Sequence, residues 1–208
     1  MKVIYCAGEQ GRVVLDILEA AGTDEKLIFA DDNPSRCNEQ IAGVEVVGGM
    51  ETLGQYSPEA MSCLVAFGDR PGVRLQIVEA LENSGHTFFN AVHPSATVSD
   101  SAALGTGLTI NAQSYIGPDV GIGDHVLIDS CVNISHETTV EVGATVTPNA
   151  TVAGGVCIEQ DAYIGPNATI TEDRTVGTGA IVGAGAVVTE DVPPHTTVVG
   201  VPAEPIER

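Results

Sequence analysis

The chain has 208 residues, of which 43% are hydrophobic and 4% aromatic, and its 28 acidic residues against eight basic ones give a formal net charge of −20 at pH 7. This hydrophobic content excludes a disordered chain. The lack of a basic stripe excludes nucleic acid as the partner, because few cations could displace counterions from phosphates.

The acidic residues are dispersed along the chain, whereas only Lys2 and Lys26 are lysines. A dispersed acidic surface that is poor in lysine is typical of proteins from a high-salt cytoplasm, where salt screens the self-repulsion of the folded state. We therefore expect a halophilic protein that low salt destabilises.

Cysteine usage and hydropathy both bear on the compartment. The number of cysteines is odd and no CxxC pair occurs, so they indicate reduced thiols in a reducing compartment: Cys6, Cys37, Cys63, Cys131 and Cys157. The apolar run at residues 3–7 is too short for the core of a signal peptide, and no stretch approaches the ~20 apolar residues of a membrane span. We expect a soluble cytoplasmic protein with no membrane partner.

Residues 1–88 are predicted to form a small Rossmann-like α/β domain. Apolar strand patterns at residues 2–6, 27–30 and 62–67 alternate with helical patterns that end near Gly22 and Gly85. In a doubly wound sheet of this kind, ligands bind at the carboxyl ends of the strands. The residues following those ends are Gly8 to Gly11, Asp31 with Asp32, and Gly68.

The glycine loop after the first strand is only weak evidence for a dinucleotide. A GxGxxG fingerprint would need glycine where this chain has Cys6, although Asp31 lies twenty residues after Gly11, at the spacing of a ribose-binding acid. A nucleotide or nucleotide-sugar head group is favoured over NAD. The alternative is that Gly8 and Gly11 only let helix and strand pack closely.

From Val92 to Val188 an aliphatic residue recurs every six positions, seventeen times, and none of these anchors is charged. A small residue often precedes each anchor by two positions, and a polar gap often opened by glycine follows it. This period predicts short strands and sharp corners around a dry aliphatic core, with five to six coils over residues 89–193. The pattern resembles the hexapeptide repeat of left-handed parallel β-helices, and the left hand comes from that resemblance.

Two features depart from the repeat. Pro193 and Pro194 break the register, so we expect residues 194–208 to form an apolar, non-helical tail that packs on the outside of the last coils. Arg174 occupies a small-residue position of a hexad, where a buried guanidinium would be costly unless it is paired. We expect the corner at residues 171–174 to let its side chain escape.

The five histidines fall into two groups according to their position relative to the repeat. His86, His93 and His195 lie at the ends of the repeat and are interpreted as structural. His125 and His136 lie in outward gaps of their hexads, so they should be exposed rather than in the core. Glu137 follows His136, and a neighbouring carboxylate can orient an imidazole and raise its basicity, as a general base requires. The alternative is a solvated surface histidine.

Four motifs occur in order along the repeat and tail: Ile134-Ser135-His136-Glu137, Ala153-Gly154-Gly155, the run from Gly183 to Val188, and Val199-Gly200-Val201-Pro202-Ala203. They resemble the signature of hexapeptide acetyltransferases. With the N-terminal α/β domain, the chain resembles the sugar O-acyltransferase family, which includes sialic acid O-acetyltransferases and UDP-4-amino-sugar N-acetyltransferases.

The resemblance implies an acetyl-CoA-dependent, metal-independent transfer to an amine or hydroxyl of a sugar, in a homotrimer with active sites between neighbouring β-helices. It implies that His136 is the general base and that Glu137 supports it. It assigns acetyl-CoA contacts to Thr145, Gly154, Pro166 and Ala184, with the Gly154 N–H near the thioester carbonyl. It assigns the nucleotide part of the acceptor to Gly8, Gln10, Asp31, Asp32 and Gly68.

Two positions depart from the family pattern. Gln10 stands where many relatives carry histidine, which leaves the nucleotide open, and Thr145 stands where they carry a second histidine nine residues after the base. The choice between N- and O-acetylation also stays open, because an attacking amine and an attacking hydroxyl need the same base.

Two alternatives come from other classes. A γ-class carbonic anhydrase-like metal enzyme would need three histidines at a site between subunits, and the coils offer only His125 and His136. A non-catalytic trimeric scaffold would need no base, so the His136-Glu137 pair argues against it.

Overall fold

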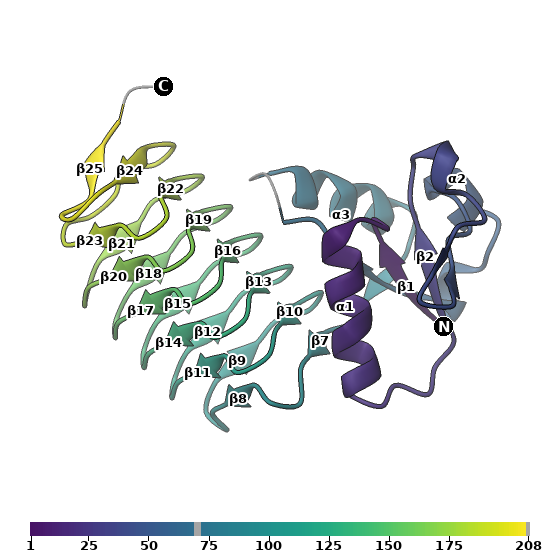
Figure 1. Ribbon diagram of the computed structural model, residues 1–208, viewed down its shortest axis with the longest axis horizontal. Coiled ribbons are helices and arrows are strands. Elements are labelled where there is room, and N and C mark those ends of the chain that lie inside the picture. The colour runs from purple at the N-terminus through teal and green to yellow at the C-terminus, as the bar shows by residue number, and fades with distance from the viewer. Residues whose placement is uncertain (69–71, 207–208) are drawn as a thin grey trace.

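The computed structural model describes residues 1–68 and 72–206, and in it an α/β domain lies against one end of a parallel β-helix (Figure 1). The C-terminal strands lie at the opposite end of the β-helix. This is the predicted fold class. No helix in the described ranges is long and apolar enough to cross a membrane.

The N-terminal domain is built on four parallel strands in the order β2-β1-β5-β6. The strands are β1 (Lys2–Tyr5), β2 (Leu27–Ala30), β5 (Ser62–Val65) and β6 (Thr87–Phe88), and the helices are α1 (Glu9–Ala20), α2 (Met50–Leu53) and α3 (Val73–Asn83). Between β2 and α2 lie a 3-10 turn (Pro34–Arg36) and a hairpin of β3 (Gln40–Ile41) and β4 (Val44–Glu45), and a second 3-10 turn (Pro58–Ala60) precedes β5.

The helices cover both faces of this sheet because alternate strand residues are apolar on both sides. Ile4 and Phe29 pack with Ile17 of α1 on one face. Val3 and Val65 pack with α2 and α3 on the other face. The carboxyl ends of β1, β2 and β5 are left open between the helices, where their loops can meet a ligand.

The β-helix has three faces, and strands that pair on one face are eighteen residues apart, as Thr109 and Leu127 are. The first face holds β7 (Ala91–Val92), β10 (Thr109–Ile110), β13 (Leu127–Ile128), β16 (Thr145–Val146), β19 (Tyr163–Ile164) and β22 (Ile181–Val182). The second holds β8 (Thr97–Val98), β11 (Tyr115–Ile116), β14 (Asn133–Ile134), β17 (Thr151–Val152), β20 (Thr169–Ile170) and β23 (Val187–Val188). The third holds β9 (Ala103–Leu104), β12 (Gly121–Ile122), β15 (Thr139–Val140), β18 (Cys157–Ile158) and β21 (Thr175–Val176).

The aliphatic core begins later than the first anchor. The anchors from Ile110 onward are at most 3% exposed, but Leu104 is 37% exposed and both Val92 and Val98 are only half-buried. The first coil has no coil beneath it, so its anchors have neighbours on one side only. The expected aliphatic anchors therefore form a buried core from the second coil to the last, and the buried hydroxyls of Ser114 and Thr138 lie in the row beside them.

From Gly107 to Gly185, every corner contains one residue with left-handed backbone, and these residues recur every six positions. Glycine, asparagine, aspartate and histidine dominate this set, as expected for residues that tolerate positive φ. The glycines that open the polar gaps have another role. A Cβ at Gly165 would lie 2.6 Å from the carbonyl oxygen of Val182, so the next coil passes too close for a side chain.

The tail adds strands to the β-helix rather than lying against its outside. After the two prolines, β24 (Thr197–Val199) pairs in parallel with β22 on the first face, and β25 (Glu204–Pro205) pairs antiparallel with β24. Val198 is 3% exposed and belongs to the aliphatic core. Arg174 does leave the interior, because its Nε donates to the Glu172 carbonyl and its Nη1 lies 4.0 Å from Asp191.

The domains meet where α3 and β6 cover a corner of the β-helix, and this contact corrects the prediction for His125. His125 is 4% exposed, and its ring packs edge-on against Phe88 with the ring centroids 4.6 Å apart. Its hexad gap does face outward, but the N-terminal domain covers it. His86 is also buried, at 6% exposure, as its structural interpretation requires.

Candidate active site

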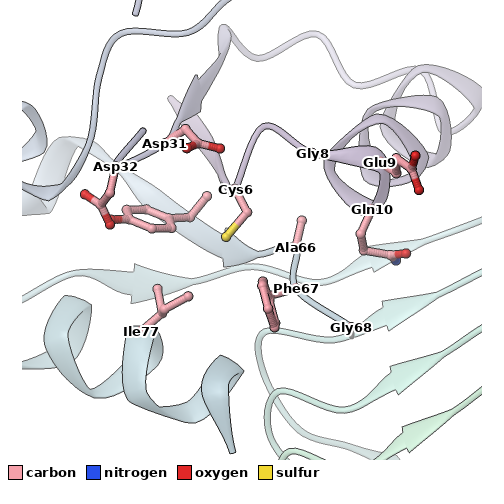
Figure 2. Close-up of a pocket in the computed structure, with 11 residues that line it drawn as sticks. Cys6, Gly8, Glu9, Gln10, Asp31, Asp32, Ala66, Phe67, Gly68 and Ile77 are labelled. Carbon is pink, nitrogen blue, oxygen red and sulfur yellow. The ribbon is translucent and has the colours of Figure 1, made fainter. Parts of the chain in front are cut away.

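A pocket of about 300 Å³ opens at the carboxyl ends of β1, β2 and β5 (Figure 2). We call it the N-terminal pocket. All five residues that the sequence assigned to the nucleotide line it: Gly8, Gln10, Asp31, Asp32 and Gly68. They come together because parallel strands place their carboxyl-terminal loops at one edge of the sheet.

The two aspartates of this pocket are held by donors of the protein itself. Asp31 accepts the backbone N–H groups of Ala7 at 2.8 Å and Asn33 at 2.9 Å. Asp32 accepts the Met50 N–H at 2.9 Å and the Tyr5 hydroxyl at 2.5 Å. These bonds fix the loops after β1 and β2. A carboxylate oxygen has two lone pairs, so each side chain keeps capacity to accept a further bond from a ligand.

Cys6 stands at the first turn of the glycine loop, with a φ of 79°. Figure 2 shows its thiol between the aspartates and Gln10. Burial, together with the carboxylates of Asp31 and Asp32, raises the pKa of the Cys6 thiol to about 12. A thiol that stays protonated near neutral pH is a poor nucleophile, so covalent chemistry at Cys6 is not favoured.

A second pocket, of about 200 Å³, lies between the two domains, and we call it the junction pocket. It shares Gln10 and Gly68 with the N-terminal pocket. Its remaining lining comes from the β-helix: Leu127, Asp129, Thr145, Thr147, Pro148, Tyr163 and Pro166. The Nε2 atom of Gln10 is buried and bonds to no group of the described residues. The two pockets therefore share a wall formed by Gln10 and Gly68.

His136 and Glu137 form a pair at the edge between the second and third faces. The Nδ1 atom of His136 lies 3.1 Å from Glu137 Oε2, and the His136 side chain is 62% exposed. A proton held on Nδ1 by the carboxylate leaves Nε2 as the basic nitrogen. Within the described ranges Nε2 has no hydrogen-bond partner, so it can accept a proton from a substrate.

Gly154 lies one coil beyond His136, and the imidazole ring of His136 occupies the space that a side chain at position 154 would fill. A Cβ on Gly154 would be 2.4 Å from His136 Cε1 and 2.7 Å from Nε2, so only glycine leaves room for the ring. The Gly154 carbonyl accepts a bond from Asp173, whereas its N–H donates to no acceptor in residues 1–68 and 72–206. An unpaired N–H beside a base is suited to bind a developing oxyanion.

The other predicted acetyl-CoA residues lie elsewhere on the β-helix. Thr145 is in β16 on the first face, and Pro166 and Ala184 lie one coil apart at the edge between the first and second faces. In a triangular cross-section, the edge that carries His136 is opposite the first face. One chain therefore does not bring its own His136 to its own junction pocket.

Arg74 is a residue that the sequence analysis did not single out. It is 4% exposed and donates hydrogen bonds across the junction between the domains. The sequence did contain one indication of its role. Arg74 lies in the first turn of a helix, where a cation is unfavourable because it opposes the helix dipole, so a specific set of acceptors is expected around it. Among residues 1–68 and 72–206 no group of three or more potential metal ligands comes together.

Two families match parts of the sequence. The family described as PglD N-terminal domain matches residues 3–81, and the bacterial transferase hexapeptide family, with six repeats, matches residues 155–190. No curated protein matches the chain.

Solved structures match over the whole length. GDP-perosamine N-acetyl transferase from Caulobacter crescentus, in complex with CoA and GDP-perosamine, is 32% identical with a TM-score of 0.93, over 100% of this chain and 97% of that chain. The acetyltransferase domain of PglB from Neisseria gonorrhoeae, in complex with acetyl coenzyme A, is 32% identical with a TM-score of 0.93. The match covers 99% of this chain and 98% of that chain. WeeI from Acinetobacter baumannii is 25% identical with a TM-score of 0.69, over 99% of both chains. This likeness supports the left hand of the β-helix.

Proposed function

Because the chain belongs to the family of hexapeptide-repeat sugar acetyltransferases that carry a PglD-type N-terminal domain, we propose that it transfers the acetyl group of acetyl-CoA to the amine of a nucleotide-linked amino sugar. The observation that carries the proposal is the pair of adjoining pockets. The N-terminal pocket has the size and loops for a nucleotide, and the junction pocket extends it toward the β-helix.

The reaction needs a general base, a hydrogen-bond donor to the oxyanion and a leaving group. The sugar amine attacks the thioester carbonyl carbon, and the carbonyl oxygen becomes an oxyanion that the Gly154 N–H stabilises. His136 Nε2 takes the proton that the nitrogen loses as the new C–N bond forms, and Glu137 stabilises the imidazolium. Collapse of the tetrahedral intermediate breaks the C–S bond. The proton on His136 then goes to the departing CoA sulfur.

We propose that the active site lies between two chains of a homotrimer. His136 is at the edge opposite the first face, whereas the junction pocket is lined by first-face residues that include Thr145, so a neighbouring chain must supply the base. Pro166 and Ala184, at another edge, then contact the pantetheine arm of acetyl-CoA. Sedimentation at high salt should give a trimer, and a monomer that retains full activity would contradict this arrangement.

We also propose that the enzyme works in a cytoplasm of high ionic strength. Both substrates are polyanions, the chain carries a net charge of −20, and no lysine or arginine of the described residues lines either pocket. Salt that screens this repulsion should help the substrates to bind. The expected effect of salt on substrate binding comes from the net charge of the whole molecule and not from one charged group.

The test is release of free CoA thiol from acetyl-CoA in the presence of GDP-linked and UDP-linked 4-amino sugars, with the corresponding hydroxy sugars as controls. We expect turnover with an amino sugar and little with its hydroxy analogue. The His136→Ala variant should lose about 100-fold to 10,000-fold in kcat, the usual contribution of a general base. Undiminished turnover by that variant would exclude His136 as the base.

A further inference from the structure

The junction between the domains contains a buried cation, Arg74. Arg74, in the first turn of α3, is 4% exposed although it is one of only eight basic residues in the chain. Burial lowers the pKa of its guanidinium to about 10, and the field of Asp161 opposes this shift. The side chain is therefore still charged near neutral pH, and a buried charge is costly unless polar partners surround it.

Five hydrogen bonds surround the Arg74 guanidinium, and each ends on an oxygen atom. Nε donates to the His125 carbonyl at 2.8 Å, and Nη1 donates to the Phe67 carbonyl at 2.6 Å. Nη2 donates to the carbonyls of Gly143 at 2.6 Å and Ala144 at 3.0 Å, and to Thr145 Oγ1 at 2.9 Å. One planar group thus joins two successive coils of the β-helix to the loop after β5.

Two of these partners line the pockets, one in each. Phe67 lines the N-terminal pocket, and Thr145 lines the junction pocket. Gly68, which follows Phe67, lines both pockets, and a Cβ on it would lie 3.3 Å from Leu127 Cδ1. The separation of the two walls is therefore fixed where Arg74 binds, although Arg74 itself lines neither pocket.

We propose that Arg74 is a positioning residue that holds the nucleotide-binding wall of the N-terminal domain at one distance from the first face, so that one nucleotide sugar can occupy both pockets. The inference rests on the proposed function. A nucleoside diphosphate needs only the N-terminal pocket, whereas the intact nucleotide sugar spans both. Arg74 then determines how much affinity the sugar adds to the nucleotide.

Lysine cannot replace this arginine. An ammonium group is a point donor with three N–H bonds, whereas the planar guanidinium of Arg74 reaches four carbonyls and a hydroxyl in different directions. The Arg74→Lys variant keeps the charge and releases part of the network, so it should alter the spacing of the walls with less disturbance than Arg74→Met.

The experiment measures dissociation constants by calorimetry in molar KCl, for the nucleoside diphosphate alone and for the intact nucleotide amino sugar. In Arg74→Lys we expect the nucleoside diphosphate to bind as in the wild type. The nucleotide sugar should bind about 10-fold more weakly, as expected if displaced walls cost the sugar about one hydrogen bond. Arg12→Met, which removes an exposed arginine from α1, is the matched control and should change neither constant.

A second pair of variants tests the same network where Arg74 variants fail to fold. Thr145→Ser keeps the hydroxyl that accepts from Arg74, whereas Thr145→Val removes it. Only the valine variant should lose sugar affinity relative to nucleotide affinity. An unchanged ratio of the two dissociation constants in Arg74→Lys, or equal ratios for the two Thr145 variants, would overturn the inference. A wild-type protein that binds no nucleotide sugar would instead overturn the proposed function.

Discussion

The Gly154→Ala substitution tests the position of the His136 imidazole, which we propose as the general base. The added Cβ would lie 2.4 Å from His136 Cε1, whereas two carbon atoms in contact stay ~3.5 Å apart, so the ring must move by about 1 Å. The His136 side chain is 62% exposed and can rotate away at a cost of about 1 kcal/mol or less. A shift of this size at the reacting group is expected to lower kcat by about 100-fold.

The substitution should leave folding and the backbone donor intact. Gly154 does not have a left-handed backbone, and alanine keeps the N–H that we assign to the oxyanion. We expect an unchanged Tm and a nearly unchanged KM for acetyl-CoA. Gly54→Ala is the matched control, because that glycine follows α2 as its C-cap with right-handed helical backbone angles, and its Cβ would meet nothing closer than 3.5 Å.

The decisive measurement is a double-mutant cycle in the thiol-release assay. If alanine at position 154 acts by displacing the imidazole, it should have almost no further effect on kcat once His136 is alanine. An equal loss of kcat in both backgrounds would refute the reasoning. An undisturbed kcat in the single variant would also refute it.

Three further predictions concern the same structure. Glu137→Gln should lower kcat about 10-fold or more, since the neutral amide no longer stabilises the imidazolium 3.1 Å away; an unchanged kcat would leave Glu137 without a role. Raising KCl from dilute buffer to molar concentration should raise Tm and lower the KM for both polyanionic substrates, and a rise in KM would contradict the electrostatic argument. Burial lowers the pKa of His125 below its ordinary value of 6.5, so its contribution to stability is complete above about pH 6.5 and is lost as the pH falls from there toward the lowered value. At constant salt the wild type should therefore lose Tm relative to His125→Leu between pH 7.5 and 5.5, and a constant difference in Tm would show that His125 does not titrate with folding.

Two histidines of the β-helix separate what the hexad pattern specifies from what it leaves open. His136 and Glu137 are neighbours in the chain, so their pairing could be predicted from the sequence. His125 occupies an equivalent outward gap, yet Phe88 covers it. The hexad pattern describes only which residues face the interior of the β-helix. It contains no information on which outward residues another domain covers.

The sequence by itself determined the β-helix and the general form of the α/β domain. Both depend on local periodicity: anchors every six residues specify the coils, and alternating strand and helix patterns specify the sheet with its ligand-binding edge. Each of these signals lies within a short segment, so no distant contact is needed to recognise it.

Only the tertiary structure decided how the domains meet and where the base lies relative to the pockets. The bonds from Arg74 to His125 and Thr145 join residues 51 and 71 positions apart, and no local pattern encodes such a pair. The tail likewise formed a strand with β22 because an open sheet end was available to it. The position of His136 on the edge opposite the first face follows from three-dimensional closure of each coil, and this geometry makes a neighbouring chain necessary for the proposed reaction.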